Sequence, residues 1–172
     1  MSKLFNFNKG LCLSPHPDDV EYSMLGTIMK HPDTSFELRQ LAQGGDCDPS
    51  TSRDRLDEVV EVWERSCCKN IKLSFTDNVF IKELSEDKWI NQIESYMDNV
   101  DAIFLPNDCD SHFEYRFISG FGPALIRNKA ISLLQYYTPS TQDEWNPNLY
   151  IDIEKYYDEK ILSLLKFKSQ NH

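Results

Sequence analysis

Residues 11–21 read Leu-Cys-Leu-Ser-Pro-His-Pro-Asp-Asp-Val-Glu, and this stretch decides the fold that the sequence predicts. Its first three residues are a short apolar run, which a proline-rich turn ends. Apolar residues then recur at near-helical spacing, at Val20, Met24, Leu25 and Ile28. The pattern therefore predicts a strand, a turn at residues 14–19 and a helix.

The alternation of strands and helices continues along the chain. Further strands are expected at residues 35–42, 71–75, 101–106, 131–137 and 150–153. Further helices are expected after a cap at Ser52 and at residues 86–97, 117–127 and 157–165. Strands that alternate with helices imply an α/β fold whose mostly parallel sheet is covered on both faces. Ligand sites of such sheets lie at the carboxyl ends of the strands.

Composition limits the classes of protein to consider. The chain has 172 residues, with 40% hydrophobic and 27% charged residues, so we expect a single globular domain over residues 1–172. Its net charge of −10 repels phosphate backbones, which argues against a nucleic-acid partner. No stretch approaches the ~20 apolar residues of a membrane span, and the N-terminus has no export signal.

The cysteines indicate a reducing compartment. The chain has five, an odd number without a C-x-x-C spacing, so they predict neither a structural zinc site nor a disulfide framework. A cytoplasmic location is therefore expected.

The turn after the first strand carries His16, Asp18 and Asp19. Zinc accepts a histidine nitrogen and a carboxylate oxygen, so one aspartate could bind a metal while the other deprotonates a metal-bound water. The alternative is structural: Asp18 could cap the helix, with Glu21 as the second half of a capping box.

A second polar turn follows the strand that ends at Pro106. It carries Asp108, Asp110 and His112, which could be caps and a structural histidine or could face the first turn. Arg55 either forms a solvated ion pair with Glu58 or belongs to the same end of the sheet. A loop that includes Gly44, Gly45 and Asp46 would lie over that end.

Residues 14–21 closely resemble the H-P-D-D-E/V-E signature of the LmbE-like, or PIG-L, deacetylases. Weaker features occur in the family's order: residues 26–28, Arg55 with Glu58, residues 105–108, residues 148–153, Lys160 and residues 168–170. The resemblance therefore covers nearly the whole chain. It implies a single-domain Rossmann-like α/β fold, a three-layer sandwich.

The resemblance also implies a chemistry, which is removal of N-acetyl groups from N-acetylglucosamine-containing glycosides with zinc or another divalent cation. It makes His16 and Asp19 metal ligands and Asp18 the general base. His112 would stabilise the oxyanion or aid the leaving group, and residue 115 would be the third metal ligand. In the family that residue is a histidine, whereas this chain has Tyr115.

Arg55 and Asp108 are the residues that we expect to contact the substrate. Phe167 also replaces a histidine that is common in the family. Many relatives continue beyond the stretch that resembles Ser169 and Gln170, so part of the pocket would come from a second subunit of a homo-oligomer or be absent.

Two hypotheses therefore stand. One is an active metallo-deacetylase in which His16, Asp19 and either His112 or Tyr115 hold the metal while Asp18 activates water. The other is a degenerate member that binds a sugar or a partner without hydrolysis, because Tyr115 and Phe167 replace histidines. A nucleotide-binding α/β domain is the weakest alternative, since neither G-x-G-x-x-G nor a P-loop pattern occurs.

Overall fold

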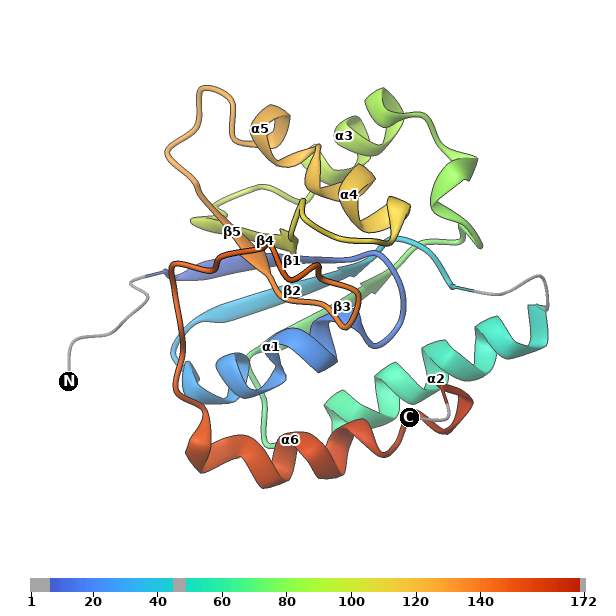
Figure 1. The fold of residues 1–172 in the computed structure, drawn as a ribbon, viewed down its shortest axis with the longest axis vertical. Coiled ribbons are helices and arrows are strands. Elements are labelled where there is room, and N and C mark those ends of the chain that lie inside the picture. Colours follow the sequence, from blue (N-terminus) through green and yellow to red (C-terminus); the bar gives the residue numbers. More distant parts are fainter. Residues whose placement is uncertain (1–6, 45–48, 171–172) are drawn as a thin grey trace.

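The structure, a computed structural model, describes residues 7–44 and 49–170 (Figure 1). Its centre is a sheet of five strands in the order β3-β2-β1-β4-β5, in which every neighbouring pair is parallel. The strands are β1 (Lys9–Ser14), β2 (Ser35–Gln40), β3 (Ile71–Phe75), β4 (Ala102–Pro106) and β5 (Ser132–Tyr136). The expected α/β class with a parallel sheet is confirmed.

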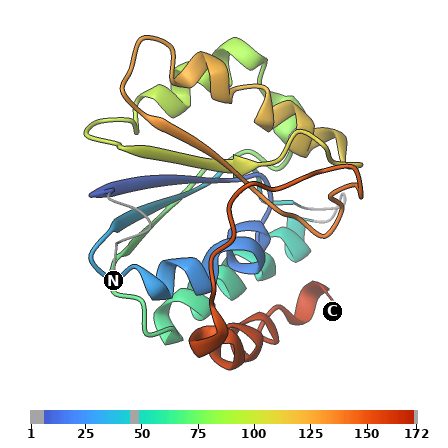
Figure 2. The same ribbon diagram turned by 60° about the vertical axis from the view of Figure 1, so that its left-hand side comes forward.

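Helices cover both faces of the sheet, as the edge-on view shows (Figure 2). One face carries α1 (Asp19–Lys30), α2 (Pro49–Arg65) and α6 (Tyr157–Leu164). The other carries α3 (Glu86–Glu94), α4 (Phe113–Ser119) and α5 (Gly122–Leu125). Three 3-10 turns complete the described elements: η1 (Ile81–Glu83), η2 (Glu154–Tyr156) and η3 (Lys168–Gln170). The expected three layers are present.

Three sequence-based expectations about helices and strands were wrong. The second helix begins at Pro49, so Ser52 lies inside it and is not its cap. The helix expected at residues 117–127 is two short helices, α4 and α5, with Gly120 after the first of them. Residues 150–153 form no strand, because Ile153 packs its side chain onto α1, where a Cβ added to Gly26 would lie 2.8 Å from its Cδ1. The expected loop residues Gly45 and Asp46, with Cys47, lie outside the described residues.

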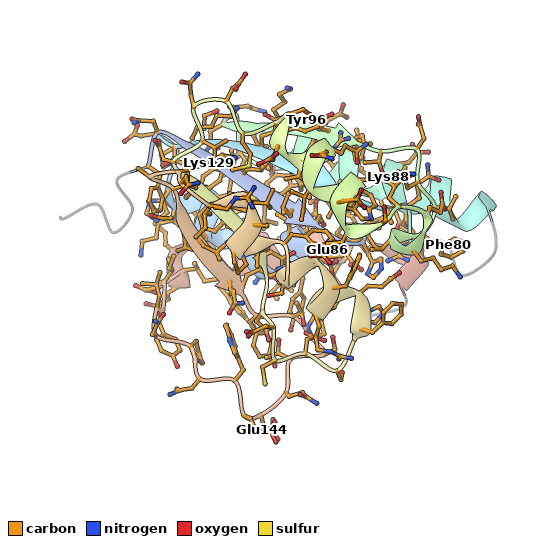
Figure 3. The ribbon with its side chains drawn as sticks, turned by 90° about the horizontal axis from the view of Figure 1, so that it is seen from above. Phe80, Glu86, Lys88, Tyr96, Lys129 and Glu144 are labelled. Atoms are coloured by element: carbon orange, nitrogen blue, oxygen red, sulfur yellow. The ribbon has the colours of Figure 1, made fainter. Side chains whose placement is uncertain are left out.

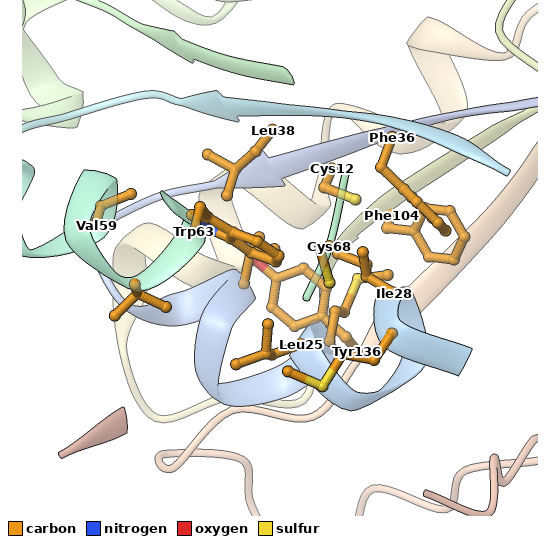
Figure 4. Packing of buried hydrophobic residues seen from close by; sticks show 14 of the residues in the cluster. Cys12, Leu25, Ile28, Phe36, Leu38, Val59, Trp63, Cys68, Phe104 and Tyr136 are labelled. Carbon is orange, nitrogen blue, oxygen red and sulfur yellow. The ribbon is translucent and has the colours of Figure 1, made fainter. Parts of the chain in front are cut away.

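Two apolar clusters hold the layers together. The first lies between the sheet and α1 and α2, where Trp63, Leu25 and Ile28 pack against Leu38 and Tyr136 (Figure 4). The second lies under α3, α4 and α5 and includes the fully buried Trp89 and Phe121. Figure 3 views this second face from above, with Lys88 and Tyr96 over it. Strands β1 and β4 are buried on both faces, which explains their unbroken apolar runs.

The order of the strands creates a switch point between β1 and β4. The chain leaves β1 through α1, on one face of the sheet, and leaves β4 through α4 and α5, on the other. The two crossovers therefore diverge and open a crevice beyond the carboxyl ends of these strands. Both polar turns expected from the sequence begin there, after Ser14 and after Pro106.

The opposite end of the same strand pair is fixed by Asp101. Its Oδ2 accepts hydrogen bonds from the backbone N–H of Asn8, at 2.6 Å, and of Lys9, at 3.0 Å. These bonds lower the pKa of Asp101 below its ordinary value. The ionised carboxylate therefore stabilises the fold above the unfolded-state pKa of about 3.9, and this stabilisation is lost as the pH falls through the lower folded-state value.

We expect an Asp101→Asn protein to unfold at a lower temperature than the natural protein at pH 7. The two unfolding temperatures should converge below about pH 4, since only the charge of Asp101 differs. Thermal unfolding followed by circular dichroism at a series of pH values measures this. A gap that stays constant with pH would contradict it.

Candidate active site

The turn after β1 is held by its own backbone and side chains. Ser14 Oγ donates to the carbonyl of His16 at 2.7 Å, and the His16 N–H donates to Asp19 Oδ2 at 2.7 Å. Asp18 has φ 95° and ψ −21°, in the left-handed region. Few residues other than glycine adopt such a conformation, and those that do are frequent at functional sites. Asp18 occupies the N-cap position of α1 but makes no side-chain capping hydrogen bond, which disfavours the structural alternative.

The carboxyl groups of this turn are buried close together. Burial and the charge of Asp19 raise the pKa of Asp18 to about 8, although the Arg55 guanidinium acts in the opposite direction. Burial also raises the pKa of Asp19, although the charge of His16 and the hydrogen bond from Tyr115 oppose the rise. Burial raises the pKa of Glu21 to about 7, and Trp63 Nε1 donates to its carboxyl group. The site thus concentrates acidic groups that water solvates poorly.

The second turn is organised by Asp110 rather than Asp108. The buried Asp110 carboxylate accepts hydrogen bonds from the Thr138 hydroxyl, from Ser140 Oγ at 2.6 Å and from the His112 N–H at 2.7 Å. These bonds connect the end of β4 to the loop after β5. Asp108 is exposed and is not among the described residues that line the two cavities of the site. Its expected contact with a substrate stays a prediction.

The two turns meet at the switch point. His16 Nε2 lies 2.6 Å from Glu114 Oε2, and the rings of His16 and His112 lie 5.2 Å apart, centroid to centroid. The Tyr115 hydroxyl donates to Asp19 Oδ1 at 2.6 Å. The structure therefore brings together the five residues expected around the metal and the water, which are His16, Asp18, Asp19, His112 and Tyr115. Sequence reasoning missed Glu114, although it lies between His112 and Tyr115 in the same motif.

Arg55 reaches this site from α2. One guanidinium nitrogen donates to the carbonyl of Gly44, and another donates to the carbonyl of Pro17 at 3.1 Å and lies 4.0 Å from Asp18 Oδ2. The expected ion pair with Glu58 is replaced, since Glu58 accepts hydrogen bonds from the N–H and the hydroxyl of Ser169. Arg55 thus holds the first turn and stands beside its carboxylates.

Two cavities border the site, and Arg55 lines both of them. The larger, about 410 Å³, is lined by Asp18, Asp19, Arg55 and Tyr115. The rest of its wall is mostly apolar or aromatic: Tyr22, Pro139, Ser140, Leu164 and Phe167. The smaller, about 210 Å³, is lined by His16, Gly44, Arg55, Val79, Phe80, His112 and Glu114. The wall of the larger cavity, mostly apolar with a few converging polar groups, is typical of small-molecule sites.

The metal-ligand set implied by the resemblance does come together, since His16 Nδ1 lies 3.8 Å from Asp19 Oδ2 and 3.5 Å from the Tyr115 hydroxyl, but the phenol does not suit a divalent cation. Burial, together with the adjacent charge of Asp19, raises the pKa of Tyr115 far above its ordinary value, so its hydroxyl keeps its proton. That proton is donated to Asp19, the second expected ligand. His16, His112 and Glu114 do fit a divalent cation: one ligand atom from each lies within 4.8 Å of the others, and His112 Nδ1 is buried without a hydrogen-bond partner.

Fold and site together define a Rossmann-like α/β domain with a carboxylate- and histidine-rich site at its switch point. No protein-family model matches the sequence, and no curated protein matches it significantly. Solved structures do match. The N,N'-diacetylchitobiose deacetylase from Pyrococcus horikoshii has a TM-score of 0.72 and 22% sequence identity, over 96% of this chain and 71% of that one. A deacetylase of teicoplanin biosynthesis has a TM-score of 0.72 and 10% identity, over 94% and 87%.

The 4-carboxy-2-hydroxymuconate hydratase from Pseudomonas putida has the same fold, with a TM-score of 0.75 and 14% identity over 96% of this chain and 80% of that one. The fold that the resemblance to LmbE-like deacetylases implied is therefore confirmed. Because a hydratase also has it, the reaction has to be argued from the site.

Proposed function

We propose that this protein is a metal-dependent hydrolase that removes the N-acetyl group from an N-acetylglucosamine-type sugar. The observation that carries the proposal is the position of Asp18, whose largely buried carboxyl group borders the larger cavity and which belongs to the same turn as His16 of the histidine cluster. The signature of residues 14–21 and the deacetylases among the structural neighbours support it.

Asp18 acts as the general base in this proposal. It takes a proton from a water molecule, whose oxygen attacks the acetyl carbonyl carbon. The C–N bond then breaks, acetate leaves, and the proton is returned to the amine of the sugar. A divalent cation bound at this site supplies Lewis acidity, which polarises the amide carbonyl and makes the water more acidic.

The larger cavity would hold the sugar. Tyr22 and Phe167 offer aromatic surface in it, and Arg55 and Ser140 offer hydrogen-bonding groups. The ring of Phe167 is almost fully buried, so it shapes the wall of the cavity and offers no ligand atom. The backbone strain at Asp18 agrees with an active-site role, since strained residues persist where the surrounding structure fixes them.

A binding module without catalysis is the second candidate. The hydrogen bond from Tyr115 to Asp19 favours it, because it occupies two of the three groups that the resemblance assigns to the metal. Such a protein would bind an N-acetylated sugar in the larger cavity and leave it unchanged.

Acetate release decides between these candidates. The purified protein is incubated with N-acetylglucosamine and with N,N'-diacetylchitobiose, each with Zn²⁺, Co²⁺, Mn²⁺ or a chelator. Free acetate and new amines are measured, and sugar binding is measured by calorimetry. Metal-dependent release of equal amounts of both products supports the hydrolase. Binding without any release supports the module, and neither binding nor release would overturn both.

The cellular location of the protein is also a proposal. No helix within residues 7–44 and 49–170 has the length and apolar character needed to cross a bilayer. Cys12, Cys67, Cys68 and Cys109, the described cysteines, are free thiols. Free thiols support a reducing compartment, and we propose the cytoplasm.

A further inference from the structure

We propose that the divalent cation of this protein is held by His16, His112 and Glu114, in place of the set His16, Asp19 and Tyr115 that the resemblance implied. Glu114 becomes a ligand, and His112 becomes a ligand instead of a catalytic group. This ligand set belongs to the same site as the proposed function, and it rests on that function only in assuming that the protein binds a divalent cation.

Asp19 and Tyr115 are already committed to each other and to the turn. Asp19 Oδ1 accepts the Tyr115 hydroxyl at 2.6 Å, and Asp19 Oδ2 accepts the backbone N–H of His16 at 2.7 Å. Both residues are buried, with exposed fractions of 2% for Asp19 and 9% for Tyr115. A cation between them would have to break this hydrogen bond, and a neutral phenol is not among the ligands that zinc ordinarily uses. The pair therefore acts as a fixed link between α1 and α4.

The three proposed ligands also converge, and each is of a residue type that binds zinc. His16 Nε2 and Glu114 Oε2 are 2.6 Å apart, and the three ligand atoms lie within 4.8 Å of one another. His112 Nδ1 is buried and lacks a hydrogen-bond partner, which is costly unless another group uses its lone pair or proton. A cation coordinated by the imidazole would remove this cost.

The chemistry of the set suits a catalytic cation. Two imidazole nitrogens and one carboxylate oxygen form a ligand set that catalytic zinc uses, with a fourth position open to water or substrate. All three residues line the smaller cavity of about 210 Å³, whose wall shares Arg55 with the larger cavity that would hold the sugar. Glu114 is held on α4 and is largely buried, so its carboxylate is already placed before a cation arrives.

The two ligand sets respond differently to substitution, and this is measurable without turnover. Zn²⁺ affinity is determined by competition with a chromophoric chelator, and Co²⁺ binding is followed by its visible absorption. We expect Glu114→Gln and His112→Ala each to weaken Zn²⁺ and Co²⁺ binding by more than about tenfold. Losses of at least that size follow even when an outer partner of a metal ligand is removed. Asp19→Asn and Tyr115→Phe should weaken binding less than Glu114→Gln does and should leave the Co²⁺ spectrum unchanged, because these residues contact His16 only as outer partners.

Glu144→Gln is the matched control, because Glu144 is exposed and is not among the residues that line either cavity of the site. Circular dichroism and unfolding temperature show whether each variant is folded. If His112→Ala does not fold, the conservative Glu114→Gln still tests the ligand set. The proposal is overturned if Asp19→Asn abolishes binding while Glu114→Gln does not, or if the natural protein binds neither ion. If the expected metal pattern is found but no acetate is released, the proposed function fails and this ligand set stands.

Discussion

An Asp18→Asn protein should release acetate roughly 100 to 10,000 times more slowly than the natural protein, the usual contribution of a general base. The amide has the shape of the carboxylate but cannot accept the proton of the attacking water. Asparagine also tolerates the positive φ of 95° at this position better than most residues, so the turn should keep its path. The rate constant kcat should therefore carry the loss, whereas sugar binding changes little.

The fold should survive this substitution. Asp18 and Asp19 are neighbouring buried carboxyl groups, and removing one charge relieves their repulsion. We expect the unfolding temperature to stay the same or rise, which is the pattern of a residue kept for activity at a cost in stability. Asp143→Asn, at an exposed position, is the control and should keep full activity. Activity in Asp18→Asn within a few-fold of the natural value would remove Asp18 from the mechanism.

A Trp89→Ala protein should lose about 3–5 kcal/mol of unfolding free energy, the range for deleting a large buried aromatic side chain. Trp89 is fully buried on α3, in the second apolar cluster. Its Nε1 donates to the carbonyl of Ile81 at 2.8 Å, so the substitution leaves a cavity and removes the shorter of the two hydrogen bonds to that carbonyl, which also accepts the Leu84 N–H at 3.4 Å. Because domains are stable by only about 5–15 kcal/mol, this is a large fraction of the total.

Chemical denaturation followed by circular dichroism measures the change. Tyr150→Ala removes another aromatic ring, but Tyr150 is 76% exposed, so its free energy of unfolding should change by less than about 0.5 kcal/mol. A loss below about 1 kcal/mol in Trp89→Ala would show that α3 and η1 collapse around the gap and contribute little to the fold.

Much of the fold could be predicted because local patterns and burial agree. Strand β3 was predicted with its exact bounds, and β1, α1 and β4 within a few residues, since each has an apolar run or an amphipathic period with a clear stop. The segment around Gly120 was predicted less well, because two short helices have the same apolar period as one long one. The apolar residues 150–153 looked like a strand, yet Ile153 is used for packing against Gly26.

The candidate site was predictable in its membership but not in its pairing. His16, Asp18 and Asp19 follow one strand and His112 follows another, so a shared edge of a parallel sheet could be inferred. Which acid faces His16 could not, because Glu114 is 98 positions away in sequence and the direction of its side chain depends on the first turn of α4. The hydrogen bond between Tyr115 and Asp19 likewise needs both helices in place.

The pairing of β1 with β4 has a consequence for the order of folding. It joins Gly10 to Ala102 in register, so the chain must close a long loop before the two turns can meet. Pairings so distant in sequence form slowly, whereas α1 and β2 follow β1 directly. The histidine cluster should therefore be among the last features to mature in a refolding chain. Recovery of Co²⁺ binding after dilution from denaturant should lag behind recovery of helix content.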